Sequence, residues 1–412
     1  MRWNGLWRQP DFLKLWAAQA VSEIGSRISR AAIPLAAVLV LGASPFQMGI
    51  LNGAGAAGVL VFGLLAGAWA DRLRRRPILI AADLGRAALL GSIPLAAAFG
   101  RLSLGHLVVV ATAAGVLTVL SDVAHQAYLP TLVEREKLLE GNSKLALSGA
   151  VAEVAGPGLA GVLVEWITAP MAIFFDAVSF LCSAVFLRRI HKPELSPARP
   201  AQPHLGREIA EGLRGAWNDP LLRAMAGRTL TAAFFLGIPG SLYFLFAVRE
   251  LRLSPALLGA VIAAGGAGSL AGAVVAERLG RHFGTGRTLI GSALVIGAAS
   301  LLVPLAHGSI AACSAFLVAA QLGDVAWPVY AIYETSLRQA VTPDRLLGRV
   351  NSAMLLLFWG VLPVGALAGG ALAQAIGMRG ALFIGAPGVL LSSLWLAFSP
   401  VRRLRALPGA AG

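Results

Sequence analysis

Long apolar segments, each of about 20 residues or more, dominate this sequence and are separated by short polar connections. A segment of this length crosses a bilayer as an α-helix, which satisfies its backbone hydrogen bonds internally. With 57% apolar and only 13% charged residues, the 412-residue chain has too little polar surface for a water-soluble protein. The sequence therefore predicts an all-α membrane protein with twelve transmembrane helices, at 15–41, 45–70, 77–99, 103–128, 143–168, 170–189, 220–248, 255–277, 286–306, 308–337, 348–376 and 378–399.

One long polar stretch, 190–219, interrupts this pattern between the sixth and seventh apolar segments. Prolines fill its first part, and apolar residues four apart over 206–219 then predict a short amphipathic helix on the membrane surface. We therefore expect three parts: an N-terminal six-helix bundle over 1–189, a cytoplasmic linker over 190–219, and a C-terminal six-helix bundle over 220–412.

The positive charge of the chain follows its predicted topology. The net charge is +14, and 24 of the 34 Lys and Arg residues lie at the two termini or in alternate connections. By the positive-inside rule, both termini and the linker are then cytoplasmic, in a bacterial-type inner (plasma) membrane. Topology accounts for the charge, so we expect a lipid bilayer and no nucleic acid as the partner.

Short patterns recur in the two halves of the sequence. The pattern S-P-x-x-x-G at 44–49 returns at 254–259, an offset of 210 residues, and the pair N-S at 142–143 returns at 351–352, an offset of 209. Six spans are an even number, so both copies have the same orientation in the membrane. The recurrence predicts two six-helix parallel repeats, an architecture of secondary transporters.

Two motifs resemble those of a known family. The connection 67–76 reads GAWADRLRRR and is similar to the signature G-x-x-x-D-R-x-G-R-R of the major facilitator superfamily, with Arg74 in place of Gly. The stretch GPGLAG at 156–161 resembles the core G-P-x-x-G-G of the superfamily's antiporter motif, with Ala160 at one glycine. Three further stretches resemble the branch that contains the enterobactin exporter and macrolide efflux proteins: 175–180, 207–223 and 347–351.

This resemblance implies the major facilitator fold and proton-coupled efflux of a small amphiphilic compound (a drug, antibiotic or siderophore-like molecule) by alternating access. The partners would be a small-molecule substrate and protons, and the protein would work as a monomer without a cofactor. Three alternatives stay open: an importer, a flippase for a lipid-like solute, and a non-transporting membrane scaffold or sensor. We expect neither an enzyme nor an ATP-driven pump, because the six histidines lack metal-ligand spacing and no P-loop motif is present.

Charged side chains inside the predicted spans are candidate binding or proton-coupling residues, because burying one in hydrocarbon costs about 2.5–3.5 kcal/mol on insertion scales. In the first span, Gln19 and three charged residues fall within an arc of about 80° on one helix face. A pair of Glu23 with Arg27 that only orders the bundle is the alternative. The substrate and coupling candidates are Gln19, Glu23, Arg27, Arg30, Asp122, Glu153, Asp324, Trp327 and Glu334.

A second set of residues is predicted to act as a gate. An acidic residue at a cytoplasmic helix end can hold an inner gate shut through ion pairs and the dipole of a helix in the other half, although a solvated topology signal is the alternative. Glycine beside proline lets helices approach closely and bend. The gating candidates are Asp71, Arg72, Glu277, Arg278, Gly156 and Pro157.

Overall fold

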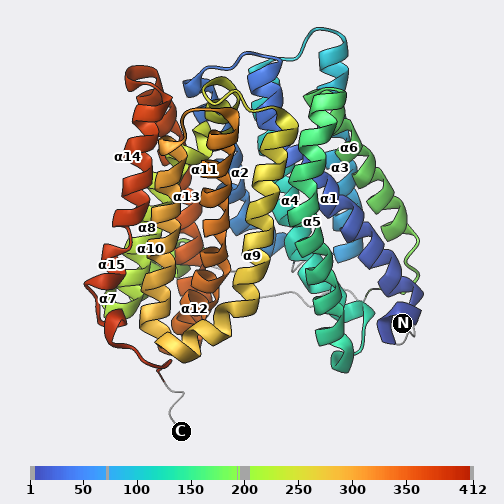
Figure 1. Cartoon of the computed structure of the whole chain (residues 1–412). Helices are drawn as coiled ribbons and strands as arrows, with labels where there is room; N and C mark the ends of the chain where they lie inside the picture. The colour runs from blue at the N-terminus through green and yellow to red at the C-terminus, as the bar shows by residue number, and fades with distance from the viewer. Residues whose placement is uncertain (1–4, 71–73, 193, 195–204, 409–412) are drawn as a thin grey trace. The chain divides into compact units, whose positions relative to one another are not determined.

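The computed structural model describes residues 5–70, 74–192, 194 and 205–408, and all regular secondary structure in these ranges is helical (Figure 1). The segments before the linker form η1 (Gly5–Arg8), α1 (Pro10–Leu39), α2 (Pro45–Ala70), α3 (Arg75–Ala98), α4 (Leu104–Leu132), η2 (Arg135–Lys137), α5 (Leu138–Trp166) and α6 (Ala169–Arg188). The remaining elements are α7 (Leu205–Asn218), α8 (Pro220–Arg249), α9 (Pro255–Phe283), α10 (Thr285–Leu305), α11 (Ile310–Leu322), η3 (Gly323–Val325), α12 (Ala326–Val341), α13 (Asp344–Ile376), α14 (Met378–Leu391), α15 (Leu394–Ala397) and η4 (Pro400–Arg403).

Helices occupy all twelve of the predicted apolar segments. Ten helical segments in the described part of the chain are long and apolar enough to cross a membrane, which identifies an integral membrane protein. Two further helices, α1 with 30 residues and α2 with 26, also have the length for a span. The tenth predicted segment is two helices, α11 and α12, joined by the 3-10 turn η3, and the twelfth is α14 followed by α15.

The predicted amphipathic helix is present as α7, which begins one residue earlier than expected and ends at Asn218. It packs against α13 and α8 and does not lie free of the helix bundle. Ala216 is buried in that contact, and Glu211 forms an ion pair with Arg349 of α13. The linker is therefore tied to the helices that follow it.

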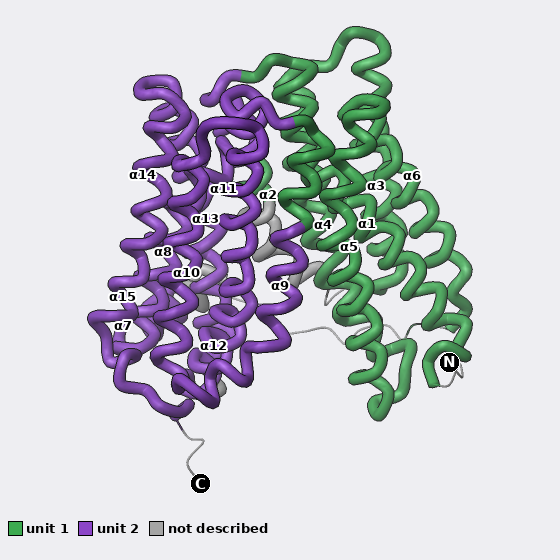
Figure 2. Tube along the Cα trace, viewed as in Figure 1, with its two compact units in different colours: residues 1–43, 54–202, 254–263 green, residues 44–53, 203–253, 264–412 purple. Residues whose placement is uncertain are grey.

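The chain divides into two compact units (Figure 2). Unit 1 comprises 1–43, 54–202 and 254–263, and unit 2 comprises 44–53, 203–253 and 264–412. In unit 1, α1 packs on α5 and α6, and α3 packs on α4 and α6. In unit 2, α13 packs on α8, and α14 packs on both α8 and α10.

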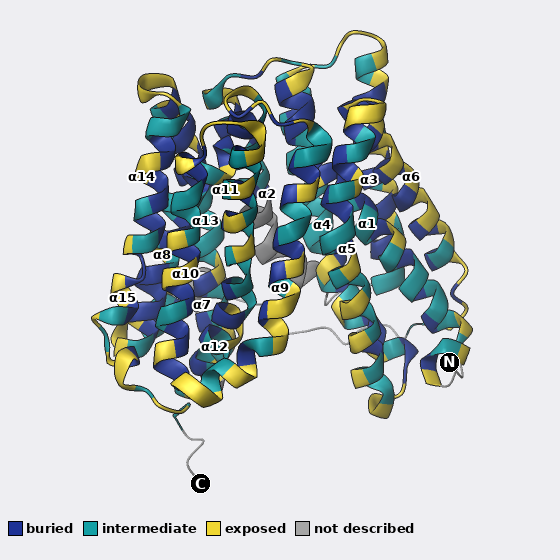
Figure 3. Cartoon of the chain, in the orientation of Figure 1, coloured by how far each residue is buried: buried dark blue, intermediate teal, exposed yellow. Residues whose placement is uncertain are grey.

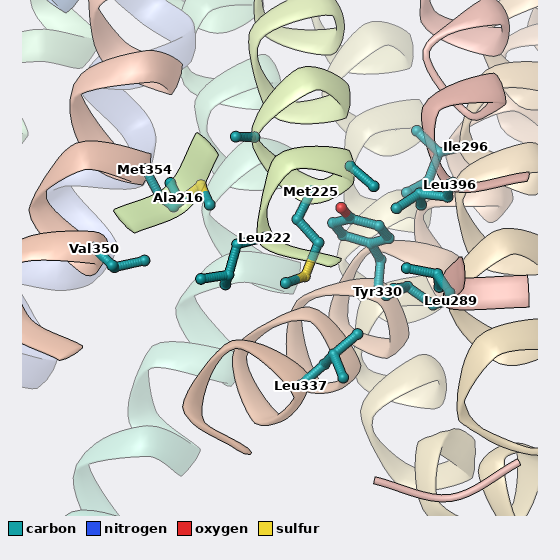
Figure 4. Close-up of a cluster of buried hydrophobic side chains, with 14 of the residues drawn as sticks. Ala216, Leu222, Met225, Leu289, Ile296, Tyr330, Leu337, Val350, Met354 and Leu396 are labelled. Atoms are coloured by element: carbon teal, nitrogen blue, oxygen red, sulfur yellow. The ribbon is translucent and has the colours of Figure 1, made fainter. Parts of the chain in front are cut away.

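Each unit has an apolar core of its own. In unit 1, Phe12, Leu79 and Tyr128 are fully buried in the core. In unit 2, Met225 of α8 packs beside Tyr330 and Leu289 (Figure 4). Large apolar side chains such as Phe175 and Val178 of α6 are nevertheless exposed. Figure 3 colours the helices by burial and shows exposed stretches on α6. An apolar exterior around an apolar core is what a bilayer allows and water disfavours.

Candidate functional site

A three-residue ion-pair cluster joins α1 to α5. Arg27 of α1 donates from Nε and Nη2 to Oε1 of Glu23, at 3.1 and 2.7 Å, and its Nη1 pairs with Glu153 of α5. The Arg27 side chain is 17% exposed. The pair that the i, i+4 spacing predicted is therefore present, and Glu153 extends it to a second helix.

The glycine of the antiporter-like motif makes this approach of α5 to α1 possible. A Cβ atom at Gly156 would lie 2.2 Å from Cβ of Arg27, which is far inside van der Waals contact. By contrast, a Cβ atom at Gly158, two residues along the same helix, would have no neighbour within 4 Å. Position 156 therefore requires glycine because a larger residue would clash with Arg27, which forms both ion pairs.

We expect Gly156→Ala to impair transport and lower the melting temperature, whereas Gly158→Ala leaves transport unchanged. The added methyl group at 156 overpacks the contact at a cost of about 1–3 kcal/mol, but alanine at an open helical position is favoured over glycine by about 1 kcal/mol. Uptake assays and melting curves of the two purified variants check this. Equal behaviour of both variants contradicts the proposed contact.

Further charges of unit 1 act on this cluster. Asp122 of α4 interacts electrostatically with Arg27 and Arg30, and with the like charge of Glu23. Asp122 and Arg30 are exposed, and Gln19 is half-buried two turns before Arg27. Three carboxylates and two guanidinium groups therefore share one region of α1, α4 and α5.

A buried ion pair on α3 was not among the predicted site residues. Arg86 donates from Nη2 to Oδ1 of Asp83 at 2.5 Å and to Oγ of Ser121 at 3.0 Å, and its guanidinium lies 4.1 Å from the ring centre of Phe180. The side chains of Asp83 and Arg86 are 2% and 7% exposed. An acid and a base three residues apart inside an apolar segment are the sequence signal for this pair.

In unit 2, a helix break carries the candidate Asp324. The 3-10 turn η3 separates α11 from α12, and Oγ of Ser269 on α9 donates to the backbone oxygen of Asp324 at 3.4 Å. Asp324 and Trp327 line a cavity of about 220 Å³ together with Tyr243 and Gln321. A 3-10 stretch inside a long helix often marks a functional hinge.

Glu334 lies on the same predicted span as Asp324 and Trp327, but its side chain has different partners. It is buried on α12 and accepts from Nη1 of Arg338 at 2.7 Å. Arg228 of α8, which is 3% exposed, stacks at 3.8 Å from the ring centre of Tyr330 in the same region. The sequence signal for Arg228 was an arginine, eight residues into the apolar segment 220–248, with no acidic residue beside it in that segment.

Of the predicted gating residues, Asp71 and Arg72 lie outside the described residues. Glu277 and Arg278 are exposed, and Glu277 lies 3.7 Å from Arg281 in a surface ion pair. The backbone around Pro157 instead makes a close helix contact, described next.

The recurring S-P-x-x-x-G pattern marks two close helix contacts. Within unit 1, a Cβ atom at Gly259 of α9 would lie 2.4 Å from the backbone oxygen of Pro157 on α5. Oε2 of Glu165 also accepts from the backbone N–H of Ala256, at 2.9 Å, at the start of α9. Within unit 2, a Cβ atom at Gly49 of α2 would lie 2.7 Å from the backbone oxygen of Ala366 on α13.

Known proteins resemble this chain over almost all of its length. It is 27% identical over 411 residues to the multidrug efflux pump Tap of Mycolicibacterium fortuitum, an alignment that covers 97% of each protein. It is 28% identical over 392 residues to the pump of the same name in Mycobacterium tuberculosis, covering 90% of this chain and 89% of that one.

A crystal structure of a bacterial homologue of the iron transporter ferroportin, in an inward-facing state, has the same fold. Its TM-score is 0.76 at 21% sequence identity, and the superposition covers 96% of this chain and 99% of that one. The sequence profile of the transmembrane secretion effector family matches residues 3–410. The chain therefore belongs to the transmembrane secretion effector family of the major facilitator superfamily, and it is a membrane transporter rather than an enzyme.

Proposed function

We propose that this protein exports a small amphiphilic compound, of the drug, antibiotic or siderophore-like kind, in exchange for protons. The cluster of Glu23, Arg27 and Glu153 is the observation that carries the proposal. Burying an ionisable side chain in a membrane costs free energy, so such residues are rare and mark functional sites. Two relatives named as multidrug efflux pumps support export as the direction.

The cluster offers a simple way to couple protons to cargo. Two carboxylates share one guanidinium, so the group of three carries one excess negative charge. A proton or a cationic part of the cargo can neutralise that charge, and each then weakens the binding of the other. Such reciprocal coupling of two ligands at one site is the thermodynamic requirement for exchange.

Alternating access would use the two glycine contacts, α5 with α9 and α2 with α13. Glycine lets two helices approach closely without large apolar side chains that interdigitate between them. Such contacts therefore suit helix surfaces that separate and re-form. We propose that the two six-helix repeats move in this way in the inner membrane, as a monomer with both termini cytoplasmic.

Purified protein in proteoliposomes with an imposed pH gradient tests the function, with a panel of candidate drugs as cargo. We expect transport that stops when the gradient is collapsed, and we expect Glu23→Gln and Asp324→Asn each to impair gradient-driven transport. The Gly158→Ala variant is the matched control, because a Cβ atom at this position meets no atom within 4 Å. Transport that persists without the gradient contradicts proton exchange, and cargo movement only in the inward direction favours an importer. Movement of lipid alone favours a flippase, and no transport of any compound favours a scaffold or sensor.

A further inference from the structure

A cavity of about 570 Å³ lies at one end of unit 2, where α9 ends and α10 begins, beside η4 and the two residues that follow it. We call it the arginine cavity. Five of its lining residues are arginines, from three separate parts of the chain: Arg281, Arg287, Arg402, Arg403 and Arg405.

Backbone hydrogen bonds hold the C-terminal wall of the arginine cavity in place. The N–H groups of Thr285 and Gly286 donate to the backbone oxygens of Arg405 and Leu404, at 3.2 and 2.9 Å. A Cβ atom at Gly286 would lie 2.0 Å from the backbone oxygen of Val401, a residue with 0% exposure. The segment is therefore docked against the start of α10, and its arginines are brought to the cavity by this docking.

The charges of the arginine cavity are not balanced within it. Among the residues that the structure describes, no carboxylate lines the cavity, and Arg281 makes one ion pair, at 3.7 Å, with the exposed Glu277. Over residues 5–70, 74–192, 194 and 205–408, the structure gives the other four arginines no ion pair. Converging guanidinium groups repel one another, so an anion bound among them is favoured. A topology signal requires positive charge on this side of the membrane, but it does not require five arginines around one hollow.

The position of the cavity selects the kind of anion. It lies at helix ends, the depth at which lipid headgroups meet a membrane protein. Phe283, which is 50% exposed, adds an aromatic surface to its lining, as is common where a side chain meets both headgroup and acyl chain. Arginine binds phosphate through two parallel hydrogen bonds.

We propose that the arginine cavity binds the headgroup phosphate of an anionic phospholipid from the adjacent leaflet. Basic pockets between transmembrane helices bind such headgroups in other membrane proteins. This inference is independent of the transported compound, because the lining arginines are separate from Glu23, Arg27 and Glu153.

Native mass spectrometry of the delipidated protein, titrated with phosphatidylglycerol, cardiolipin or phosphatidylcholine, tests the proposal. We expect the anionic lipids to bind and phosphatidylcholine not to bind. The triple variant Arg402→Gln, Arg403→Gln, Arg405→Gln should bind the anionic lipids about 100-fold more weakly, since each interfacial arginine contributes about fivefold to the affinity. Its melting temperature without lipid, and its elution volume, report whether it is folded.

A second triple variant of equal charge loss is the matched control. Arg135, Arg188 and Arg189 are exposed arginines of unit 1, and changing all three to Gln should leave lipid binding within about twofold of the wild type. Equal weakening in both triple variants would show that general surface charge attracts the lipid, and it would overturn the proposal. Inorganic phosphate at millimolar concentration is a further arm: if it stabilises the wild type while the anionic lipids do not, the ligand is a soluble anion and the lipid assignment is wrong.

Discussion

Replacing Arg27 with Gln is expected to abolish gradient-driven transport and to lower the melting temperature of the purified protein. Arg27 is the shared partner of Glu23 and Glu153, so its loss leaves two carboxylates together without their counter-ion. Breaking a buried pair from one side costs about 3–5 kcal/mol. We expect the low end of that range, because the Glu153 side chain is 44% exposed.

Three further variants separate the charge of Arg27 from its geometry. Arg27→Lys keeps the charge but lacks the planar fork that reaches both carboxylates, so we expect a folded protein with reduced transport. Arg30→Gln removes an exposed arginine of the same helix that has no ion pair within the described ranges, and we expect a smaller effect. A triple variant with Gln at 23, 27 and 153 should recover thermal stability without gradient-driven transport. Wild-type transport in Arg27→Gln would remove the cluster from the mechanism.

Helix positions followed from the sequence, because the length of an apolar segment needed to cross a bilayer is fixed by bilayer thickness. The break at η3 was not predicted, although the sequence carries a local signal for it: Pro328 has no N–H to donate to the backbone oxygen of Asp324, four residues earlier. The break depends on α9, where Gly272 leaves room for the backbone of Val325 and Ser269 donates to the oxygen of Asp324. The break therefore has a local cause in Pro328 and a tertiary one in the contact with α9.

In the candidate site, likewise, contacts within one helix could be predicted from the sequence, whereas contacts between helices could not. Glu23 and Arg27 could be paired from their spacing, since residues four apart share a helix face. Glu153 could be named as a candidate but not paired, because its partner lies 126 positions away on another helix. Asp324 and Glu334, ten residues apart, share one face of a regular α-helix, but the 3-10 stretch η3, with about 3.0 residues per turn, shifts the angle between them.

The recurrence of the pattern S-P-x-x-x-G has a physical meaning that the sequence alone did not provide. In both copies the glycine of S-P-x-x-x-G faces backbone of another helix: Gly259 faces Pro157, and Gly49 faces Ala366. A backbone oxygen cannot rotate away as a side chain can. A methyl group at either glycine therefore disfavours the packed arrangement itself, and this makes the contact open to a direct test.

Gly259→Ala is expected to shift the protein toward conformations in which α9 and α5 are apart, and to reduce transport because the packed state is depleted. Overpacking of about 1–3 kcal/mol corresponds to a population shift of about tenfold or more. The measurement is the rate at which a membrane-impermeant maleimide labels Ala256→Cys, after Cys182 and Cys313 have been replaced by Ala; we expect about a tenfold faster rate, because residue 256 is half-buried beside Gly161 of α5 in the packed state. Gly291→Ala is the control, because a Cβ atom there meets no atom within 4 Å. If labelling does not change in Gly259→Ala but the protein loses thermal stability, the contact is a fixed packing element and does not open during transport.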